Sequence, residues 1–524
     1  MLEQLRTPAL VIGCGIAGGT AALRLADAGL PVVVISAAAD AHATNTWHAQ
    51  GGIVYRGRDD QAAWLEEDIL LAGAGANRRA AVRLLARAGP RLVEQVLLER
   101  LGVAFDREAD GALALTLEGG HRCPRIIHVA DATGQALQRA LIDALRAHPR
   151  VTLLSGQVAT ALLTTPDRRA CAGALCWDVA AQSWRLIVAG ATVLATGGLA
   201  AIYRRSSNPP AAVGAGVALA AAVGARLADL EYVQFHPTAL ALPDAPAYLI
   251  SEAVRGAGAR LLNDMGEPFM ARYAPQWRDL APRDVVARAI VSEMAARDLP
   301  HVWLDLAGAL PAEQIRRRFP TITAQCAGYG LDITRAPLPV APAAHYTCGG
   351  VAVDTWGRTS LPGLYAVGET ACSGLHGANR LASTSLLEGV VWGARAAQHI
   401  LHTRAAPPPC APPAVPQGAD PPQPEVYAEL RARIGAIMER GVGLVRQASG
   451  LRAALDHLRS LRHQVLLLYH TQQPNTELLR LRAAAESAVA VAQAALRNRR
   501  SRGCHYRSDA PAADEQDRWM RINL

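Results

Sequence analysis

A glycine-rich turn near the N-terminus limits the fold more than any other feature of the sequence. It reads Gly13-Cys-Gly-Ile-Ala-Gly18 and follows the apolar segment 9–12. The first glycine permits a tight turn, the second lets a pyrophosphate approach the backbone, and the third lets a helix pack closely on a strand. We therefore predict a helix to about Ala28 and a second strand over 31–36, which together form a dinucleotide-binding unit.

Two later segments are predicted to add strands to the same sheet. Residues 191–195 are apolar and lead into Thr196-Gly-Gly198, and residues 363–368 precede a helix expected from about Ser385. Strands that alternate with helices indicate an α/β architecture. The acidic residue that usually binds a ribose after the second strand is missing, because Ala37 stands there.

Composition excludes several classes of protein. With 524 residues, of which 51% are hydrophobic, the chain should form two or three globular domains. The net charge of +8 is spread along the chain, so we expect no nucleic-acid partner. Nine cysteines without a CxxC pair predict a reducing compartment and no metal site. The start lacks a charged leader, and the most apolar stretch, 211–225, is too short to span a bilayer, so we expect a soluble cytoplasmic protein without a membrane partner.

The C-terminal part has its own organisation. Residues 403–425 are rich in proline and are interpreted as a linker. Beyond it, apolar residues recur at helical spacing, and three amphipathic helices are predicted to form a bundle over 426–500. The polar tail over 501–524 carries no prediction of regular structure.

Ordered motifs along the chain point to a known family. Ala49-Gln-Gly-Gly-Ile53 resembles a segment of the succinate dehydrogenase/fumarate reductase flavoprotein family. The resemblance extends from Val11 to about Pro511. It rests on Ala195-Thr-Gly-Gly198, Phe235-His-Pro-Thr238, Ala281-Pro-Arg-Asp284, His345-Tyr-Thr-Cys-Gly-Gly350, Gly368-Glu369 and His376-Gly-Ala-Asn-Arg380.

The resemblance implies a complete architecture. The fold class is expected to be α/β, with a Rossmann-like FAD-binding domain, an inserted α+β capping domain and a C-terminal three-helix bundle. The expected boundaries are 1–229 and 347–402 for the discontinuous FAD-binding domain, 230–346 for the capping domain, 403–425 for the linker, 426–500 for the bundle and 501–524 for the tail.

The family's motifs also imply which residues bind FAD. By match these are Gly13, Gly15, Ile16, Ala17, Gly18, Ser36, Asn45, Thr46, Trp47, His48, Ala49, Gln50, Gly51, Gly52, Glu369, Ser385 and Leu386. Respiratory members attach FAD covalently through a histidine where this chain has Asn45, so the FAD is expected to be non-covalent. Ala37, Ala215 and Thr384 replace polar residues usual in the family, which predicts weak retention of FAD.

A second set of residues is expected to bind a dicarboxylate. His236, His345 and Arg380 resemble the family's carboxylate ligands, and Ser251 can add a hydrogen bond. Arg283 matches the family's proton donor and acceptor. Because arginine holds its proton firmly, a relay there needs a neighbouring carboxylate or water, and a plain electrostatic clamp is the alternative.

Glu118 is the residue that would select an amino acid. The segment Leu117-Glu-Gly-Gly-His121 resembles a loop that carries a neutral amide in the succinate enzymes. A carboxylate there would pair with a substrate ammonium group, whereas the alternative is a solvated loop glutamate.

Together these matches imply FAD-dependent oxidation of L-aspartate to iminoaspartate, with O2 (giving H2O2) or fumarate as acceptor. This would be the first step of NAD biosynthesis, functionally linked to quinolinate synthase. The alternatives are a soluble fumarate reductase or succinate-oxidising flavoprotein, an inactive flavin-binding scaffold and an NAD-binding dehydrogenase. The last of these leaves the motifs around Gln50 and Arg380 unexplained.

Overall fold

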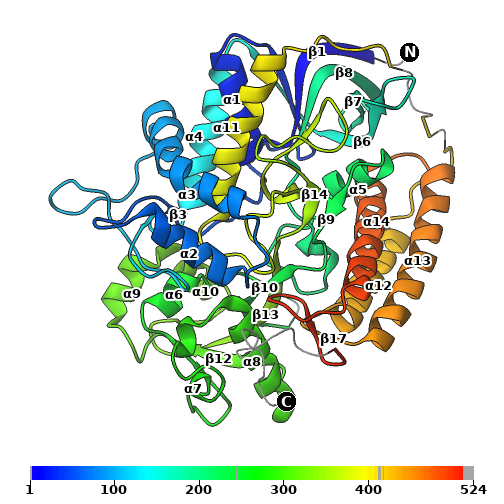
Figure 1. The fold of residues 1–524 in the computed structure, drawn as a ribbon. Coiled ribbons are helices and arrows are strands. Elements are labelled where there is room, and N and C mark those ends of the chain that lie inside the picture. Colours follow the sequence, from blue (N-terminus) through cyan, green and yellow to red (C-terminus); the bar gives the residue numbers. More distant parts are fainter. Residues whose placement is uncertain (1–2, 244, 411–414, 417, 511–524) are drawn as a thin grey trace.

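The main sheet is built mostly from strands of the N-terminal part of the chain (Figure 1). The structure is a computed structural model, and it describes residues 3–243, 245–410, 415–416 and 418–510. The strands run in the order β5-β2-β1-β8-β7-β6, and β15 pairs additionally with β8. Their bounds are β1 (Glu3–Ile12), β2 (Val32–Ser36), β5 (Val151–Ser155), β6 (Gln157–Thr164), β7 (Cys171–Asp178), β8 (Ser183–Leu194) and β15 (Leu364–Ala366).

The pairing brings the glycine turns to one edge of this sheet. Strands β1, β2, β8 and β15 are parallel, and Leu194 pairs with both Ile12 and Ala366. The turns at Gly13, Gly197 and Gly368 therefore leave neighbouring strands at the same carboxyl edge, where α/β proteins bind their ligands. This confirms the α/β interpretation of the sequence.

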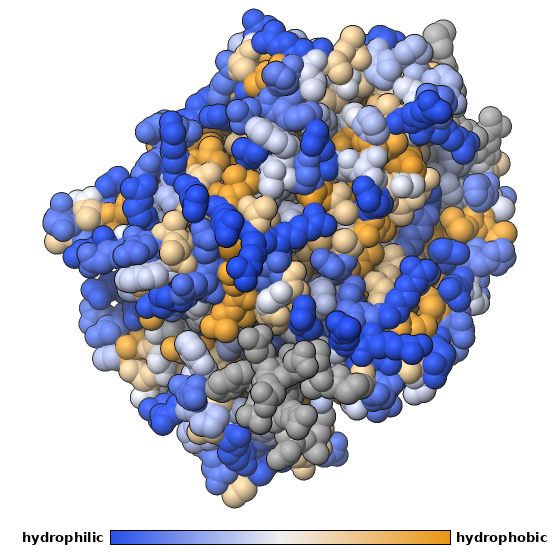
Figure 2. Space-filling view, in the orientation of Figure 1, coloured by the Kyte–Doolittle hydropathy of each residue, from blue (hydrophilic) through white to orange (hydrophobic). Residues whose placement is uncertain are grey.

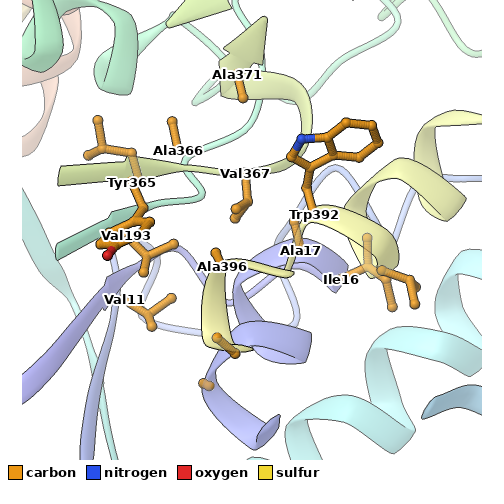
Figure 3. Packing of buried hydrophobic residues seen from close by; sticks show 14 of the residues in the cluster. Val11, Ile16, Ala17, Val193, Tyr365, Ala366, Val367, Ala371, Trp392 and Ala396 are labelled. Carbon is orange, nitrogen blue, oxygen red and sulfur yellow. The ribbon is translucent and has the colours of Figure 1, made fainter. Parts of the chain in front are cut away.

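Helices pack against this sheet, and two of them approach very closely (Figure 1). Helix α1 (Ile16–Asp27) lies along α11 (Ser385–Thr403). Helix α4 (Thr133–Ala147) packs against α1, and α3 (Arg79–Val93) packs against α11. A side chain at Gly393 would lie 2.5 Å from the carbonyl oxygen of Ala17, so only glycine permits this contact. Ala17, Val367 and Trp392 belong to the buried core in this region (Figure 3).

A second, antiparallel sheet carries the middle of the chain. Its strand order is β10-β13-β12-β11, and helix α8 packs on β10 and β13. The elements of this region are β10 (Val233–Leu240), β11 (Arg260–Leu262), β12 (Val302–Asp305), β13 (Leu338–Thr347), α6 (Glu252–Gly256), α7 (Met270–Tyr273), α8 (Arg283–Ala296), α9 (Ala312–Arg318), α10 (Pro320–Gly328) and the 3-10 turn η3 (Arg278–Leu280).

Three long helices form the bundle expected for the C-terminal part. They are α12 (Pro424–Gly441), α13 (Ala448–Thr471) and α14 (Thr476–Arg497). Leu430, Ile434 and Met438 are buried as the periodicity predicts, and the bundle shares one core with Phe235 of β10 and neighbouring residues. The fold class inferred from the resemblance is therefore confirmed.

Short elements complete the described chain. They are β3 (Ile53–Val54), β4 (Ile126–Ile127), β9 (Leu227–Ala228), β14 (Gly350–Ala352), β16 (Ala371–Cys372), α2 (Ala62–Ala72), α5 (Ala215–Ala222), the π-helical η1 (Glu94–Arg100) and the 3-10 turns η2 (Ala200–Ile202) and η4 (Gly368–Thr370). Among the described residues, no helix is long and apolar enough to cross a membrane. Hydrophilic residues cover most of the face seen in Figure 2.

The beginning of the tail contains a short strand, although no regular structure was predicted there. Strand β18 (Tyr506–Arg507) pairs in parallel with β17 (Val445–Arg446). The backbone N–H of Cys504 donates to Ala378 O at 2.9 Å, and Arg288 Nη1 donates to Gly503 O at 3.0 Å. These long-range contacts order residues that have no local periodicity. Positions 511–524 of the tail lie outside the described residues.

Candidate active site

One continuous cavity connects the carboxyl edge of the main sheet with the second sheet. Its lining includes Gly13 and Gly15 of the glycine turn, Glu369 and Ser385 after β15, and Arg283 of α8. The six residues expected at the substrate site all line it: Glu118, His236, Ser251, Arg283, His345 and Arg380. The structure thus brings together segments that are hundreds of residues apart in the sequence.

The glycine turn has the geometry that the sequence predicts. Gly13 has a φ of +110°, and a side chain there would lie 2.2 Å from the carbonyl oxygen of Ala195. A side chain at Gly18 would lie 2.0 Å from the carbonyl oxygen of Gly13, so this glycine serves the packing of α1 on the turn. Among the cofactor residues expected from the motifs, Gly18 and Trp47 are absent from the described residues that line the cavity. Trp47 instead packs against His42 and Arg139.

Two helix N-termini face the cavity without a side-chain cap. Gly15 precedes α1, Thr384 precedes α11, and neither makes a side-chain capping bond. The backbone N–H of Ile16, at the start of α1, donates to Thr46 Oγ1 at 3.0 Å, and the positive end of each helix dipole suits an anionic or electron-rich ligand. In addition, the buried Gln50 Oε1 has no hydrogen-bond partner among the residues described. These features fit a dinucleotide with a flat polar ring such as FAD.

Glu369 offers a buried carboxylate to such a ligand. Its Oε1 accepts from the backbone N–H of Thr347 at 3.1 Å, and its Oε2 accepts from Asn45 Nδ2 at 3.1 Å. Burial raises the pKa of this carboxyl to about 7 despite these two bonds. The side-chain amide of Asn45 also donates to Asn208 Oδ1 at 2.9 Å, so it is hydrogen-bonded to both Glu369 and Asn208.

We expect FAD affinity to fall as the pH drops below about 7. A hydroxyl group of FAD that donates to Glu369 would stabilise the ionised carboxylate. Binding of FAD should therefore lower the pKa of Glu369 and release a proton. By linkage, the dissociation constant should rise by up to about tenfold for each pH unit below the pKa of the free protein. Titration of the apoprotein with FAD between about pH 5.5 and about pH 8 measures this dependence. Glu369→Gln is the control, and an equal pH slope in that variant would contradict the assignment.

Arg380 supplies a buried positive charge to the cavity. It is 5% exposed, and its pKa is lowered to about 10 by burial and by the nearby Arg283. Its Nη1 donates to Ser385 Oγ and its Nη2 to His345 Nε2, both at 3.1 Å, while Nε has no partner among the described residues. No carboxylate in the described part of the chain forms a hydrogen bond with this guanidinium. A buried cation in this state favours an anionic ligand.

The two histidines of the cavity are held neutral. Burial and the charge of Arg283 lower the pKa of both His236 and His345 well below the usual value. Because a guanidinium can only donate, His345 Nε2 must accept from Arg380, and its Nδ1–H then donates to Ser207 Oγ at 2.8 Å. His236 Nδ1 accepts from the backbone N–H of Thr238 at 3.2 Å, which leaves its Nε2 as a buried donor without a partner among the described residues. His236 can thus donate to a ligand carboxylate without carrying a charge.

Arg283 is held by two side chains that the sequence motifs did not single out as ligands. Its Nε lies 2.5 Å from Glu252 Oε2, and its Nη1 donates to Gln234 Oε1 at 3.2 Å. Burial alone would raise the pKa of Glu252, but Arg283 and Arg255 together lower it, so this carboxylate stays ionised. Gln234 lies two positions before His236 on β10, and this period-two spacing is the sequence signal that would have found it.

Glu118 faces the cations from the opposite loop. It is 4% exposed, and its Oε2 accepts from Ser383 Oγ at 2.7 Å. Burial, followed by repulsion from Glu252, raises the pKa of Glu118. Ser251 lies beside this region as the N-cap of α6, where its Oγ accepts from the backbone N–H of Ala253. The alternative of a solvated loop glutamate does not hold, because Glu118 is buried and lines the cavity.

The arrangement can bind a small molecule that carries two negative charges and one positive charge. Arg283, Arg380 and the two neutral histidines supply donors to carboxylates. Glu118 supplies an acceptor for a cationic group at the same cavity.

Comparisons with known proteins agree with this geometry. A family model described as "FAD binding domain" matches residues 9–386, and one described as "Fumarate reductase flavoprotein C-term" matches residues 431–524. Over 513 residues the chain is 44% identical to "L-aspartate oxidase 1" of Ralstonia nicotianae, covering 96% of this chain and 95% of the relative. It is also 44% identical over 521 residues to the "L-aspartate oxidase" of Halobacterium salinarum, covering 98% and 99% of the two chains.

Solved structures give the same picture. A mutant of E. coli quinol fumarate reductase FrdA superposes with a TM-score of 0.88 at 26% identity, covering 98% of this chain and 93% of the other. Mycobacterium smegmatis Sdh1, solved with UQ1, superposes with a TM-score of 0.81 at 31% identity, covering 98% and 90%.

Proposed function

Since the chain belongs to the flavoprotein family of the L-aspartate oxidases and fumarate reductases, we propose that it oxidises L-aspartate to iminoaspartate with FAD as its cofactor. The observation that carries this proposal is the buried Glu118 opposite Arg283 and Arg380 in one cavity. A dicarboxylate alone would supply anions to the arginines and leave Glu118 without a cationic group from the ligand, whereas the ammonium group of L-aspartate pairs with it.

Each side chain then has a stated task in binding. Arg380 and Arg283 hold the two carboxylates, and His236 Nε2–H donates a further hydrogen bond. Glu118 binds the ammonium group, and its raised pKa suits it to take the proton that this amine loses. Bound FAD supplies a two-electron acceptor for the hydride that leaves the substrate α-carbon. The cations stabilise charge that develops on the substrate carboxylates.

Both roles considered for Arg283 remain compatible with its contacts. Glu252 is the neighbouring carboxylate that a proton relay requires, at 2.5 Å from Arg283 Nε. The same ion pair also fixes the guanidinium rigidly, as an electrostatic clamp requires. In either role, Arg283 holds a substrate carboxylate by electrostatic attraction.

The wider setting is also part of the proposal. O2, giving H2O2, or fumarate accepts the electrons, and iminoaspartate passes to quinolinate synthase in the biosynthesis of NAD. FAD is held without a covalent bond, in keeping with Asn45 at the attachment position. Nine free thiols support a reducing compartment such as the cytoplasm.

One assay tests the proposal directly. The purified protein is supplied with FAD and L-aspartate, and peroxide is followed with and without fumarate. Peroxide formation, together with anaerobic bleaching of the flavin absorbance by L-aspartate, is expected. Turnover of succinate but not of L-aspartate would instead establish the alternative, a soluble fumarate reductase or succinate-oxidising flavoprotein. Failure of both substrates to bleach the flavin would establish an inactive scaffold.

We expect weak retention of FAD in this chain. Ala215 begins α5 and lines the cavity where the family usually has an aspartate, and Ala37 lines it after β2. Each lost polar contact costs about 1 kcal/mol, so Ala215→Asp should tighten FAD binding about fivefold. Ala221→Asp, at an exposed position on the same helix, is the charge-matched control. A nanomolar dissociation constant and full occupancy after dialysis of the unmodified protein would contradict this expectation.

A further inference from the structure

Glu118 is oriented by a hydroxyl group that no motif assigned to the site. Ser383 Oγ donates to Glu118 Oε2 at 2.7 Å, and Ser383 itself lines the cavity. The other carboxylate oxygen, Oε1, faces Gly51, where an added side chain would lie 2.9 Å from it. The bond from Ser383 therefore occupies one oxygen of Glu118 and leaves the second one toward the FAD-binding motif and the cavity.

The backbone at Ser383 is held in an uncommon conformation. Its φ is +53°, in the left-handed region that residues other than glycine rarely adopt. The conformation is fixed by Ser383 O, which accepts from Val54 N at 3.1 Å, and by the adjacent Ala382 O at 3.0 Å from His121 Nε2. Strain of this kind persists where the surrounding structure holds it, often at functional sites. The contact to His121 also ties this segment to the loop that carries Glu118.

The charges around Glu118 explain why such a donor is needed. Burial and Glu252 of α6 oppose its ionisation, whereas Arg283 of α8 and Arg380 favour it. Arg255 of α6 belongs to the same group of charges. Ser383 supplies the hydrogen bond that favours the charged carboxylate without competing for the anionic substrate, because its hydroxyl is neutral.

We propose that Ser383 is a positioning residue that determines specificity: its hydroxyl orients Glu118 so that Oε1 receives the substrate ammonium group. This inference rests on the proposed oxidation of L-aspartate. A substrate without an amine, such as succinate, does not use this contact. Ser383 therefore contributes to the discrimination between amino-dicarboxylates and dicarboxylates, and it contributes little to the binding of dicarboxylates as such.

The test uses two variants of the FAD-loaded protein. Both Ser383→Ala and Ser383→Gly remove the hydroxyl, but glycine also removes the backbone strain at the positive φ. In both variants, KM for L-aspartate should rise about tenfold or more, with a smaller change in kcat, since a hydrogen bond to a charged group is lost. The acid side of the kcat/KM profile should move to higher pH, because the pKa of Glu118 rises without the donor. The dissociation constant of succinate, measured by calorimetry, should stay within about twofold of the parent value.

The outcomes separate this inference from the proposed function. If the unmodified protein does not oxidise L-aspartate, the proposed function itself fails. If it does, and both variants keep the parent KM and pH profile, the role of Ser383 is overturned. Equal weakening of succinate and L-aspartate would also overturn it, because that result indicates a general disturbance of the site. Agreement between the two variants in selectivity, with the glycine variant the more heat-stable, supports the role of the hydroxyl rather than of the strain.

Discussion

Replacement of Glu118 by glutamine is expected to lower kcat/KM for L-aspartate by about two to three orders of magnitude. The buried carboxylate and the substrate ammonium group form a charge pair in a cavity where burial already opposes the carboxylate's ionisation. Glutamine keeps the size of the side chain and can accept from Ser383 Oγ, but it does not neutralise the ammonium group. Succinate carries no amine, so its oxidation should be maintained or improved.

Steady-state kinetics with both substrates measure this reversal of preference. Glu99→Gln, at an exposed position of η1, is the control that removes the same charge away from the cavity. An unchanged kcat/KM for L-aspartate in the Glu118 variant would remove the physical basis for selection of an amino acid.

Replacement of Arg380 by glutamine should show a different pattern, because it should impair the use of both substrates. Arg380 is the buried guanidinium whose Nε has no partner in the described part of the chain, and it offers a planar fork to a carboxylate. Its loss should lower kcat/KM for L-aspartate and for succinate alike, by about three orders of magnitude. The free energy of unfolding of the ligand-free protein should not fall. Burial and Arg283 lower the pKa of Arg380 to about 10, so the guanidinium is still charged at neutral pH but is less stable in the folded protein than in the unfolded chain. Removal of this charge should therefore not destabilise the fold.

Kinetics and thermal unfolding of the same samples test the two halves of this prediction. Arg462→Gln, at an exposed position on α13, is the matched control. Loss of activity with a marked fall in the melting temperature would contradict it, since that result assigns Arg380 a structural role.

Local sequence patterns predicted the elements whose formation depends on neighbouring residues in the chain. The turn at Gly13, the helix that follows it and the bundle around Leu430 each carry their own signal in spacing or in glycine placement. The members of the site were likewise recognisable, because His236 and Arg380 stand in ordered motifs. What a motif gives is the identity of a residue, and its partners follow only from the folded chain.

The remaining contacts depend on residues that are distant in the sequence. The bond from Ser383 to Glu118 spans 265 positions, and the contact of Arg380 with His345 spans 35. Neither the neutral state of His345 nor the raised pKa of Glu369 follows from a linear pattern, since both arise from burial among charges brought together by folding. The order of residues 501–510 has the same origin, and composition alone predicted no regular structure there.

The ordered start of that tail has a consequence for how the cavity is assembled. The backbone N–H of Cys504 donates to the carbonyl oxygen of Ala378, which lies two positions before Arg380. The carbonyl oxygen of the neighbouring Gly503 accepts from Arg288 of α8. Asn379 Nδ2 in turn donates to Asp284 Oδ1 at 3.0 Å. Residues 503–504 thus contact both the loop that carries Arg380 and helix α8, which begins with Arg283. These two tail contacts can form only after residues 503 and 504 have been synthesised.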